Sequence, residues 1–173
     1  APDAEAVVSG TTDISALSSS GGTLELNGSS ITINPTDDAA TVQASINFVS
    51  GTTGITASLG TSDELILTSA DADTDINIGG GSTTAVLNEL GLSAGSTGAP
   101  NLLSQNAVSQ GQTLTVEVAQ AGAQTITFGT GAGEVSTLDE LNSALAALSG
   151  VSASVDTLTG DISIVASSST ASL

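Results

Sequence analysis

Lysine, arginine and histidine are absent from this sequence of 173 residues, as are cysteine, methionine, tryptophan and tyrosine, and only two phenylalanines are present. Acid–base and nucleophilic catalysis draw mainly on His, Lys, Cys, Tyr or a carboxylate in a perturbing pocket. No basic side chain is available here to activate a Ser or Thr hydroxyl, so a Ser/His/Asp or Cys/His arrangement is impossible within this chain. The sequence therefore predicts no catalytic, cofactor-binding or metal-binding residues, and it argues against an enzyme.

The charged residues are all acidic, and the formal net charge is −18. Nucleic acids are bound through Lys and Arg that displace counterions from phosphates, so DNA, RNA and anionic lipid headgroups are expected to be repelled. No apolar run approaches the ~18 residues of a membrane span, and no positively charged signal-peptide start is visible. We therefore expect neither nucleic acid nor a membrane as a partner.

Hydrophobic residues nevertheless make up 39% of the chain, and the mean hydropathy is +0.31. Disordered acidic chains have low hydrophobicity, so this composition predicts folded domains, stabilised by apolar burial and backbone hydrogen bonds. The absence of cysteine removes disulfides, which is unusual for small secreted domains but common in proteins exported unfolded.

Two stretches of the chain, 22–70 and 112–169, repeat one order of patterns. Each opens with two runs of alternating apolar residues, a period typical of strands with one buried face. In the first copy these runs are joined by Asn27-Gly28, which is a strong signal for a tight hairpin. The apolar positions are Leu24, Leu26, Ile31 and Ile33 in the first copy, and Leu114, Val116, Val118, Ile126 and Phe128 in the second, where Ala121-Gly122 forms the turn.

A helix is predicted next in each copy. It begins at residues 35–38 (PTDD) and 136–140 (STLDE), whose Thr and Asp side chains can accept hydrogen bonds from free N–H groups. Apolar stripes at spacings of three and four follow, and Gly51 and Gly150 are expected to end the helices in left-handed conformations. The stripes consist of Val42, Ile46 and Val49, and of Leu138, Leu141, Leu145 and Leu148.

Two further alternating strands complete each copy, at 55–59 and 65–67 and at 151–155 and 162–164. The predicted fold class is therefore α+β, with two tandem β-β-α-β-β modules that each pack a helix on a mainly antiparallel sheet. Residues 1–98 form the first predicted domain and residues 99–173 the second. Between the copies we expect a strand at 76–78, a helix at 84–90 ending at Gly91, and a linker at 91–100. In the leading segment, residues available to pack on the first module are Val7, Val8, Ile14 and Leu17.

These modules resemble the flagellin IN motif, which occurs in the outer domains of bacterial flagellins and in some hook-associated proteins. The first copy carries the resemblance in GTLELNG at 22–28, ITI at 31–33, DAATV at 38–42, IN at 46–47, GITASL at 54–59 and LILTS at 65–69. The second matches more loosely, through DEL at 139–141 and VSASV at 151–155, and it lacks the Asn-Gly turn. Together the copies span about two-thirds of the chain.

The resemblance implies an extracellular structural role, as the solvent-exposed outer domain of a flagellar filament subunit. Flagellin assembles through long terminal helices, and no sustained heptads occur here, so contacts with other flagellin subunits are expected through regions absent from this chain. The fragment itself is expected to be monomeric. The alternatives are the outer domain of a hook-associated or filament-cap protein, and an adhesive module of a surface adhesin or S-layer protein.

Several local motifs suggest sharper functions. Asp71, Asp73 and Asp75 alternate as calcium ligands do, but an EF-hand needs Gly and Glu where Ile76 and Ser82 stand. Carboxylate pairs of the kind that cleave glycosides are explained by helix starts, and the glycine runs lack the Lys of a phosphate-binding loop. The pairs are Asp37/Asp38 and Asp139/Glu140, and the glycine runs lie at 79–81 and 129–133.

Modification by sugars is a further expectation. Turns rich in Ser and Thr, at 18–20 and 167–169, are candidates for O-linked glycans, although no single acceptor is favoured. Asn27-Gly28-Ser29 fits an N-glycosylation sequence, but the hairpin turn explains these residues better.

Overall fold

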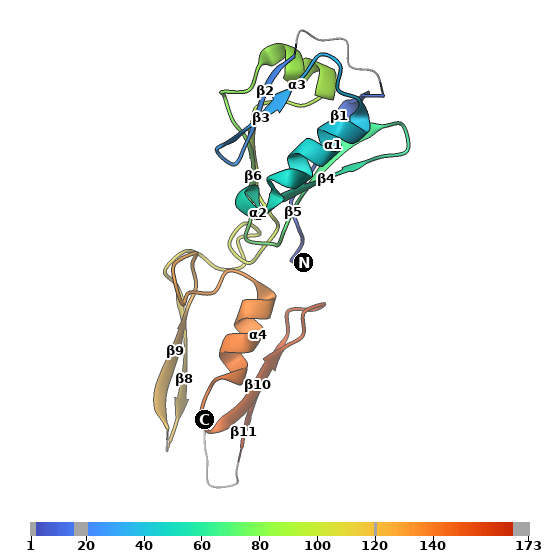
Figure 1. The fold of residues 1–173 in the computed structure, drawn as a ribbon. Helices are drawn as coiled ribbons and strands as arrows, with labels where there is room; N and C mark the ends of the chain where they lie inside the picture. The colour runs from blue at the N-terminus through green and yellow to red at the C-terminus, as the bar shows by residue number, and fades with distance from the viewer. Residues whose placement is uncertain (1–2, 16–20, 120, 168–173) are drawn as a thin grey trace. The chain divides into compact units, whose positions relative to one another are not determined.

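The computed structural model describes residues 3–15, 21–119 and 121–167, and it has the predicted α+β class. The chain divides into two compact units, drawn in Figure 1. Glu5–Ala99 form the N-terminal unit, and residues from Pro100 onward form the C-terminal unit together with Asp3 and Ala4. The N–H of Ala4 donates to the carbonyl of Pro100 over 3.0 Å, which ties the start of the chain to the C-terminal unit.

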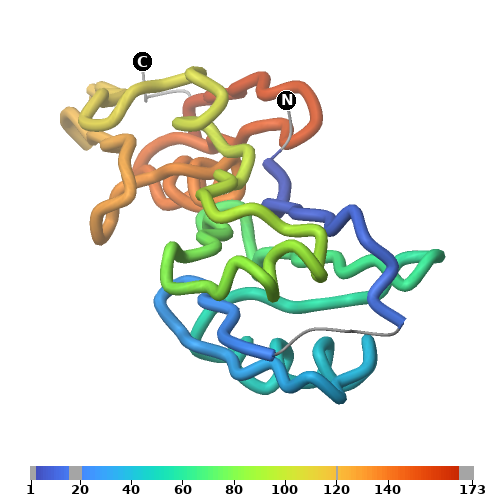
Figure 2. Tube along the Cα trace, turned by 90° about the horizontal axis from the view of Figure 1, so that it is seen from above, coloured from blue at the N-terminus to red at the C-terminus, as the bar shows by residue number. Residues whose placement is uncertain are grey.

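The described residues of the N-terminal unit form a three-stranded sheet, a four-stranded sheet and three helices. The first sheet has the order β1 (Val7–Asp13), β5 (Glu64–Ser69), β4 (Ile55–Leu59). The second has the order β3 (Ser29–Ile33), β2 (Gly22–Leu26), β6 (Ile76–Ile78), β7 (Gly95–Thr97). The helices are α1 (Ala39–Phe48), α2 (Ser50–Thr53) and α3 (Thr84–Leu90). Figure 2 shows the β4–β5 hairpin from above, with its two antiparallel strands side by side.

The β2–β3 hairpin turns through Asn27-Gly28, as the sequence predicts. Both residues have positive φ, 45° and 78°, which is the conformation that a two-residue turn of this type requires. The register pairs Leu26 with Ser29 and Leu24 with Ile31. The apolar positions of both strands face one side and join the core of the unit, which confirms the predicted alternation; these are Leu24, Leu26, Ile31 and Ile33.

Helix α1 begins where the sequence predicts. Asp38 is its N-cap, and the carboxylate accepts a hydrogen bond from the N–H of Thr41. Val42 and Ile46 are fully buried and Val49 packs against the same core, which confirms the stripe. The predicted end at Gly51 is wrong. The chain continues into the short helix α2, and Gly54, with φ of 67°, supplies the left-handed residue instead.

The outer edge of β4 is closed by side chains of α1. The side-chain carbonyl of Asn47 accepts from the N–H of Ala57 over 2.7 Å, and its amide donates to the carbonyl of Ala57 over 3.0 Å. Gln43 donates to the same carbonyl over 3.2 Å. An unpaired strand edge is a template for association with another chain. The side-chain amides of Asn47 and Gln43 occupy the N–H and C=O of Ala57, which would otherwise be free to pair with a neighbouring strand.

The segment that follows the first module is part of the fold. The predicted strand at 76–78 and the predicted helix at 84–90 are present as β6 and α3, and Gly91 ends the helix with φ of 64°. The predicted linker at 91–100 is wrong, because β7 pairs with β6 along its whole length and Leu92 and Ala99 are buried. Strand β7 carries only Gly, Ser and Thr, so it is held by backbone bonds and leaves no hydrophobic pattern in the sequence.

The leading segment forms β1, which pairs with β5. Ile14 is fully buried and Val8 packs partly against the core, as expected. Val7 is 52% exposed, so its predicted packing is wrong: successive residues of a strand point to opposite faces, and Val8 takes the inner one. Leu17 lies outside the described residues.

The C-terminal unit repeats the order of the first module with smaller sheets. Its elements are β8 (Thr113–Val118), β9 (Gly122–Thr127), α4 (Leu138–Ala146), β10 (Val151–Val155) and β11 (Ile162–Ala166). Thr137 and Glu140 form a reciprocal capping box at the start of α4. The predicted stripe is confirmed, because Leu138, Leu141 and Leu145 are buried and Leu148 is half-buried. Ile164 packs against this core, whereas Ile162 is 45% exposed.

The end of α4 differs from the prediction. The helix stops at Ala146, and its C-cap residue Ala147 keeps a right-handed conformation. Gly150 does have a positive φ of 81°, but it lies at the turn into β10. Gln124 links this turn to β9: its side-chain amide donates to the carbonyl of Ser149 over 2.9 Å and accepts from the N–H of Ser149 over 2.8 Å.

The order β-β-α-β-β thus occurs in both units, but the two hairpins of each module do not share one sheet. In the N-terminal unit the first hairpin pairs with β6 and the second with β1. In the C-terminal unit each hairpin is a two-stranded sheet of its own. Each helix therefore packs between two separate hairpins, where the sequence led us to expect a single sheet.

Candidate interaction groove

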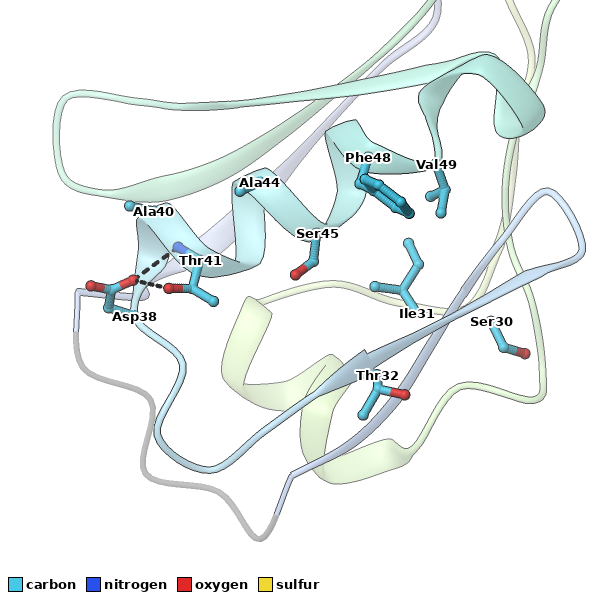
Figure 3. Close-up of a pocket in the computed structure, with 10 residues that line it drawn as sticks. All are labelled: Ser30, Ile31, Thr32, Asp38, Ala40, Thr41, Ala44, Ser45, Phe48 and Val49. Atoms are coloured by element: carbon cyan, nitrogen blue, oxygen red, sulfur yellow. Dashed lines mark hydrogen bonds between the residues drawn. The ribbon is translucent and has the colours of Figure 1, made fainter.

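The N-terminal unit has a groove between the outer face of α1 and the edge strand β3, about 680 Å³ in volume (Figure 3). Among the described strands β3 pairs only with β2, so it lies at the edge of its sheet. The groove is lined from the strand side by Ser30, Ile31 and Thr32, and from the helix side by Asp38, Ala40, Thr41, Ala44, Ser45, Phe48 and Val49.

The turn fixes which backbone groups of β3 face outward. In a two-residue hairpin the residues that flank the turn, here Leu26 and Ser29, exchange hydrogen bonds with each other, and every second pair does the same. Ser30 and Thr32 belong to the intervening pairs. Their partners on β2, Glu25 and Thr23, bond instead to residues on the other side of β2: Glu25 O accepts from Gly79 N (2.9 Å), and Thr23 O from Thr83 N (2.8 Å). The N–H and C=O groups of Ser30 and Thr32 therefore point away from the sheet.

The helix wall of the groove is made by small side chains and one large one. Ala40, Ala44 and Phe48 recur at intervals of four, which places them along one face of α1. Phe48 is 90% exposed, the most exposed of the large hydrophobic residues in the described chain. In Figure 3 its ring and the side chain of Ile31 lie on facing sides of the groove. The ring therefore offers apolar area to any molecule that enters the groove.

One end of the groove carries a carboxylate. Asp38 Oδ1 accepts from both the hydroxyl and the N–H of Thr41, over 2.7 and 2.8 Å. These hydrogen bonds, the one from the hydroxyl first, hold the pKa of Asp38 below its ordinary value, so the group stays ionised in mildly acidic solution. In Figure 3 the other carboxylate oxygen points away from Thr41.

The acidic loop at Asp71, Asp73 and Asp75 is a turn stabilised by its own side chains. Asp71 Oδ1 accepts from the N–H of Asp73 and the hydroxyl of Thr74, and Asp75 Oδ1 accepts from the N–H of Ala99. Within the described residues no three acidic side chains gather closely enough to bind a metal ion. Asp71 and Asp75 therefore accept hydrogen bonds from different parts of the chain.

The paired carboxylates also serve the backbone. Asp37 accepts from the N–H of Asn34 over 2.8 Å, Asp38 caps α1, and Glu140 accepts from the N–H groups of Ser136 and Thr137. Asp139 lies in the first turn of α4, where a carboxylate favours the helix dipole. Both pairs lie at helix starts, as their sequence context suggests.

Each glycine run holds a glutamate of the same chain. Glu25 Oε2 accepts from the N–H of Gly81 over 2.8 Å, and Glu134 Oε2 accepts from the N–H of Gly131 over 2.9 Å. A Cβ at Gly79 or Gly129 would overlap these carboxylates. The loops do bind anions through backbone N–H groups, but the anion is an internal side chain.

These examples share one cause. More than half of the eighteen carboxylates accept a hydrogen bond from a backbone N–H, because the chain has no cation to pair with them. Asp13 is another case: a hydrogen bond from the backbone of Ser15 holds its pKa below the ordinary value. The acidic residues therefore cap the starts of helices and close turns as well as giving the surface its charge.

The side chain of Asn27 is fully used inside the N-terminal unit. Its amide donates to the carbonyls of Thr53 and Asp75, over 2.8 and 2.9 Å, and its carbonyl accepts from the N–H of Asn77 over 2.7 Å. A sugar on this nitrogen would replace one of its two hydrogens and so break one of the first two bonds. Of the Ser-rich turns proposed for O-linked sugars, Ser167 is exposed, and residues 18–20, 168 and 169 lie outside the described residues.

A smaller cavity of about 320 Å³ lies in the C-terminal unit, among Leu102, Val108, Phe128, Leu138, Leu141 and Ile162. Gln105 also lines it, and the side-chain nitrogen of Gln105 is buried without an acceptor. A single water molecule satisfies such a group in many proteins, so this cavity by itself does not identify a ligand.

Sequence reasoning missed the groove. The signal was present as the line of Ala40, Ala44 and Phe48, which lies off the buried stripe of α1 and contains one of the two phenylalanines. The sequence could not identify β3 as the opposite wall of the groove, because the position of β3 at a sheet edge depends on how distant strands pair.

No protein-family model matches the chain, and no curated protein matches it in sequence. The resemblance to the flagellin IN motif therefore stays a prediction. None of the helices in the described ranges is long and apolar enough to cross a membrane.

Proposed function

We propose that this chain is the outer, solvent-exposed part of a bacterial flagellar filament subunit, with a structural and not an enzymatic role. The observation that carries the proposal is the repeated order of two hairpins around a capped helix, in residues that resemble the flagellin IN motif. Asn27 and Asn47 belong to the segments of the first copy that resemble the motif, and their side chains bond to separate parts of the N-terminal unit.

The charge of the chain supports an outer position. Eighteen carboxylates without a cation favour solvation and keep identical domains from adhering to one another. Many of these carboxylates also cap helices and turns, so the charge is compatible with a folded surface domain. In this role the module gives the filament its surface, its solubility and its antigenic identity, with O-linked sugars as candidate modifications.

The proposal requires assembly helices elsewhere in the full polypeptide. The longest described helix, α1, has ten residues, too few for the heptad repeats that pack filament cores. Reading the natural gene outward from both ends of this sequence tests the requirement. Long amphipathic helical regions on both sides support a filament subunit, whereas tandem β-repeats or an anchoring signal would refute it and favour an adhesin or S-layer module.

The nearest alternative is the same module in a hook-associated or filament-cap protein, which shares the flanking helices. Location within the filament separates the two proposals, because a filament subunit occurs along the whole length and a cap or junction protein only at one end.

A further inference from the structure

We propose that the groove between β3 and α1 binds an extended, basic peptide segment of a partner protein, which adds to β3 as a further antiparallel strand. This inference goes beyond the filament role and does not depend on it. Three features of the groove carry it: free backbone groups on one wall, an exposed aromatic ring on the other, and a carboxylate at one end.

The backbone wall offers a strand-shaped set of partners. Ser30 and Thr32 each direct one N–H and one C=O outward, and none of these groups takes part in a hydrogen bond within the described chain. An added antiparallel strand meets such pairs at every second residue. Because β2 and β6 already pair antiparallel within this sheet, an antiparallel newcomer continues the existing pattern.

The other sheet edges of the N-terminal unit are less suited to strand addition. Strand β4 is closed by the side chains of Asn47 and Gln43, and β1 donates the N–H of Thr11 to the carbonyl of Gly91 over 3.1 Å. Strand β7 has only three residues. Natural proteins close or shorten their edges to prevent association, so the edge left open beside an apolar groove is the one available for a partner.

The groove also sets the direction and chemistry of the occupant. Strand β3 runs from Ser30 toward the start of α1, and in Figure 3 Asp38 lies at one end of the groove and Ser30 at the other. An antiparallel segment therefore begins beside Asp38 and later passes between Ile31 and Phe48. A Lys or Arg near its amino end would meet the carboxylate, and an aliphatic side chain further along would cover the ring.

Charge decides against a second copy of the chain as the occupant. The chain has no Lys, Arg or His to place beside Asp38, and two copies at −18 each repel one another. A basic segment is attracted by the same field and steered toward the groove. The partner class is therefore a protein with an exposed, basic and aliphatic β-type segment.

Titration of the chain with the peptide acetyl-KTVTVTV-amide, followed by NMR of the backbone amides, tests the proposal. We expect shifts confined to the amides of residues 29–33 and the outer face of α1. The peptide acetyl-ETVTVTV-amide and a KTVTVTV peptide with N-methylated valines are expected to bind at least about tenfold more weakly, since they lack the charge and the strand bonds respectively.

Two variants locate the contacts. Phe48→Ser removes a ring that is 90% exposed and Asp38→Asn keeps a good helix cap without the charge, so both should fold. Binding should weaken about tenfold for Phe48→Ser and severalfold for Asp38→Asn. Val7→Ser and Asp13→Asn, which change an exposed apolar side chain and a carboxylate elsewhere in the same unit, should leave binding unchanged.

Several results would overturn the proposal. Absence of shifts at millimolar peptide would rule out the site, and equal binding of the N-methylated peptide would rule out strand addition. Equal binding of the acidic peptide would rule out the basic partner class. Concentration-dependent shifts at residues 29–33 without any peptide would assign the groove to a second copy of the chain instead.

Discussion

Replacing Asn47 by leucine should destabilise the N-terminal unit by much more than the same change at its neighbour Gln43. Asn47 gives Ala57 both an acceptor at 2.7 Å and a donor at 3.0 Å, whereas Gln43 gives only a donor at 3.2 Å. Ala57 is 6% exposed, so water cannot readily replace the lost partners. In Asn47→Leu the N–H of Ala57 has no acceptor, while its carbonyl keeps Gln43.

The expected loss of stability follows from this difference between the bonds of Asn47 and Gln43. A buried N–H left without an acceptor costs about 1–3 kcal/mol, and the better helix propensity of Leu returns a few tenths of a kcal/mol. We therefore expect Asn47→Leu to lower the free energy of unfolding by about 2 kcal/mol. Gln43→Leu should cost about 0.5–1 kcal/mol, because the carbonyl of Ala57 still accepts from Asn47.

The measurement is urea unfolding followed by far-ultraviolet circular dichroism, since the chain has no Trp or Tyr to report by fluorescence. Amide hydrogen exchange by NMR adds a local readout: the Ala57 amide should lose protection in Asn47→Leu and keep it in Gln43→Leu. Equal destabilisation by the two variants, or an unchanged Ala57 amide in Asn47→Leu, would contradict the account of a side chain that closes the strand edge.

Three further predictions concern charge and caps. Raising NaCl from 10 to about 150 mM should increase the melting temperature, because screening weakens repulsion among carboxylates and no Lys or Arg ion pair is lost; a decrease would show that attractive pairs had been overlooked. Thr137→Ala should lower the stability of the C-terminal unit by about 1 kcal/mol, as measured by urea unfolding, while Thr137→Ser should restore most of it. The lowered pKa of Asp38 implies stability that is present above the ordinary Asp range and lost as pH falls through the lowered value. Below pH 4, wild type should therefore lose stability faster than Asp38→Asn, and parallel pH profiles would refute this.

The sequence predicted the features that depend on neighbouring residues. The Asn27-Gly28 turn and the helix starts at 35–38 and 136–140 all rely on contacts within a few positions, where residue type and conformation are directly linked. The buried stripes of α1 and α4 followed for the same reason, since periodicity reports which face is inward.

The features that the sequence did not predict depend on distant pairing. Strand β1 joins β5 across more than fifty residues, and no local pattern states which sheet a hairpin will enter. Strand β7 carries no hydrophobic side chain, so residues 91–100 have the composition of a linker although their backbone completes a sheet. The end of the first helical region moved from Gly51 to Gly54 because α2 adds a further turn.

Only one wall of the candidate groove could be predicted from the sequence. The helical spacing of residues places Phe48 off the buried stripe of α1, which indicates that its ring is exposed. The groove beside this ring could be identified only from the structure, which places β3 at the edge of a sheet with the backbone groups of Ser30 and Thr32 facing outward. The glutamates inside the glycine runs could not be predicted either, because Glu25 reaches Gly81 from a strand 56 positions away.

The filament proposal is tested most directly by immunogold labelling of the source bacterium with antibodies raised against this chain. The account predicts gold particles along the full length of the flagellar filaments. Gold confined to the filament tip or to the junction with the hook would favour a cap or hook-associated protein. Labelling of the cell body without labelled filaments would contradict the proposal and assign the chain to an adhesin or surface layer.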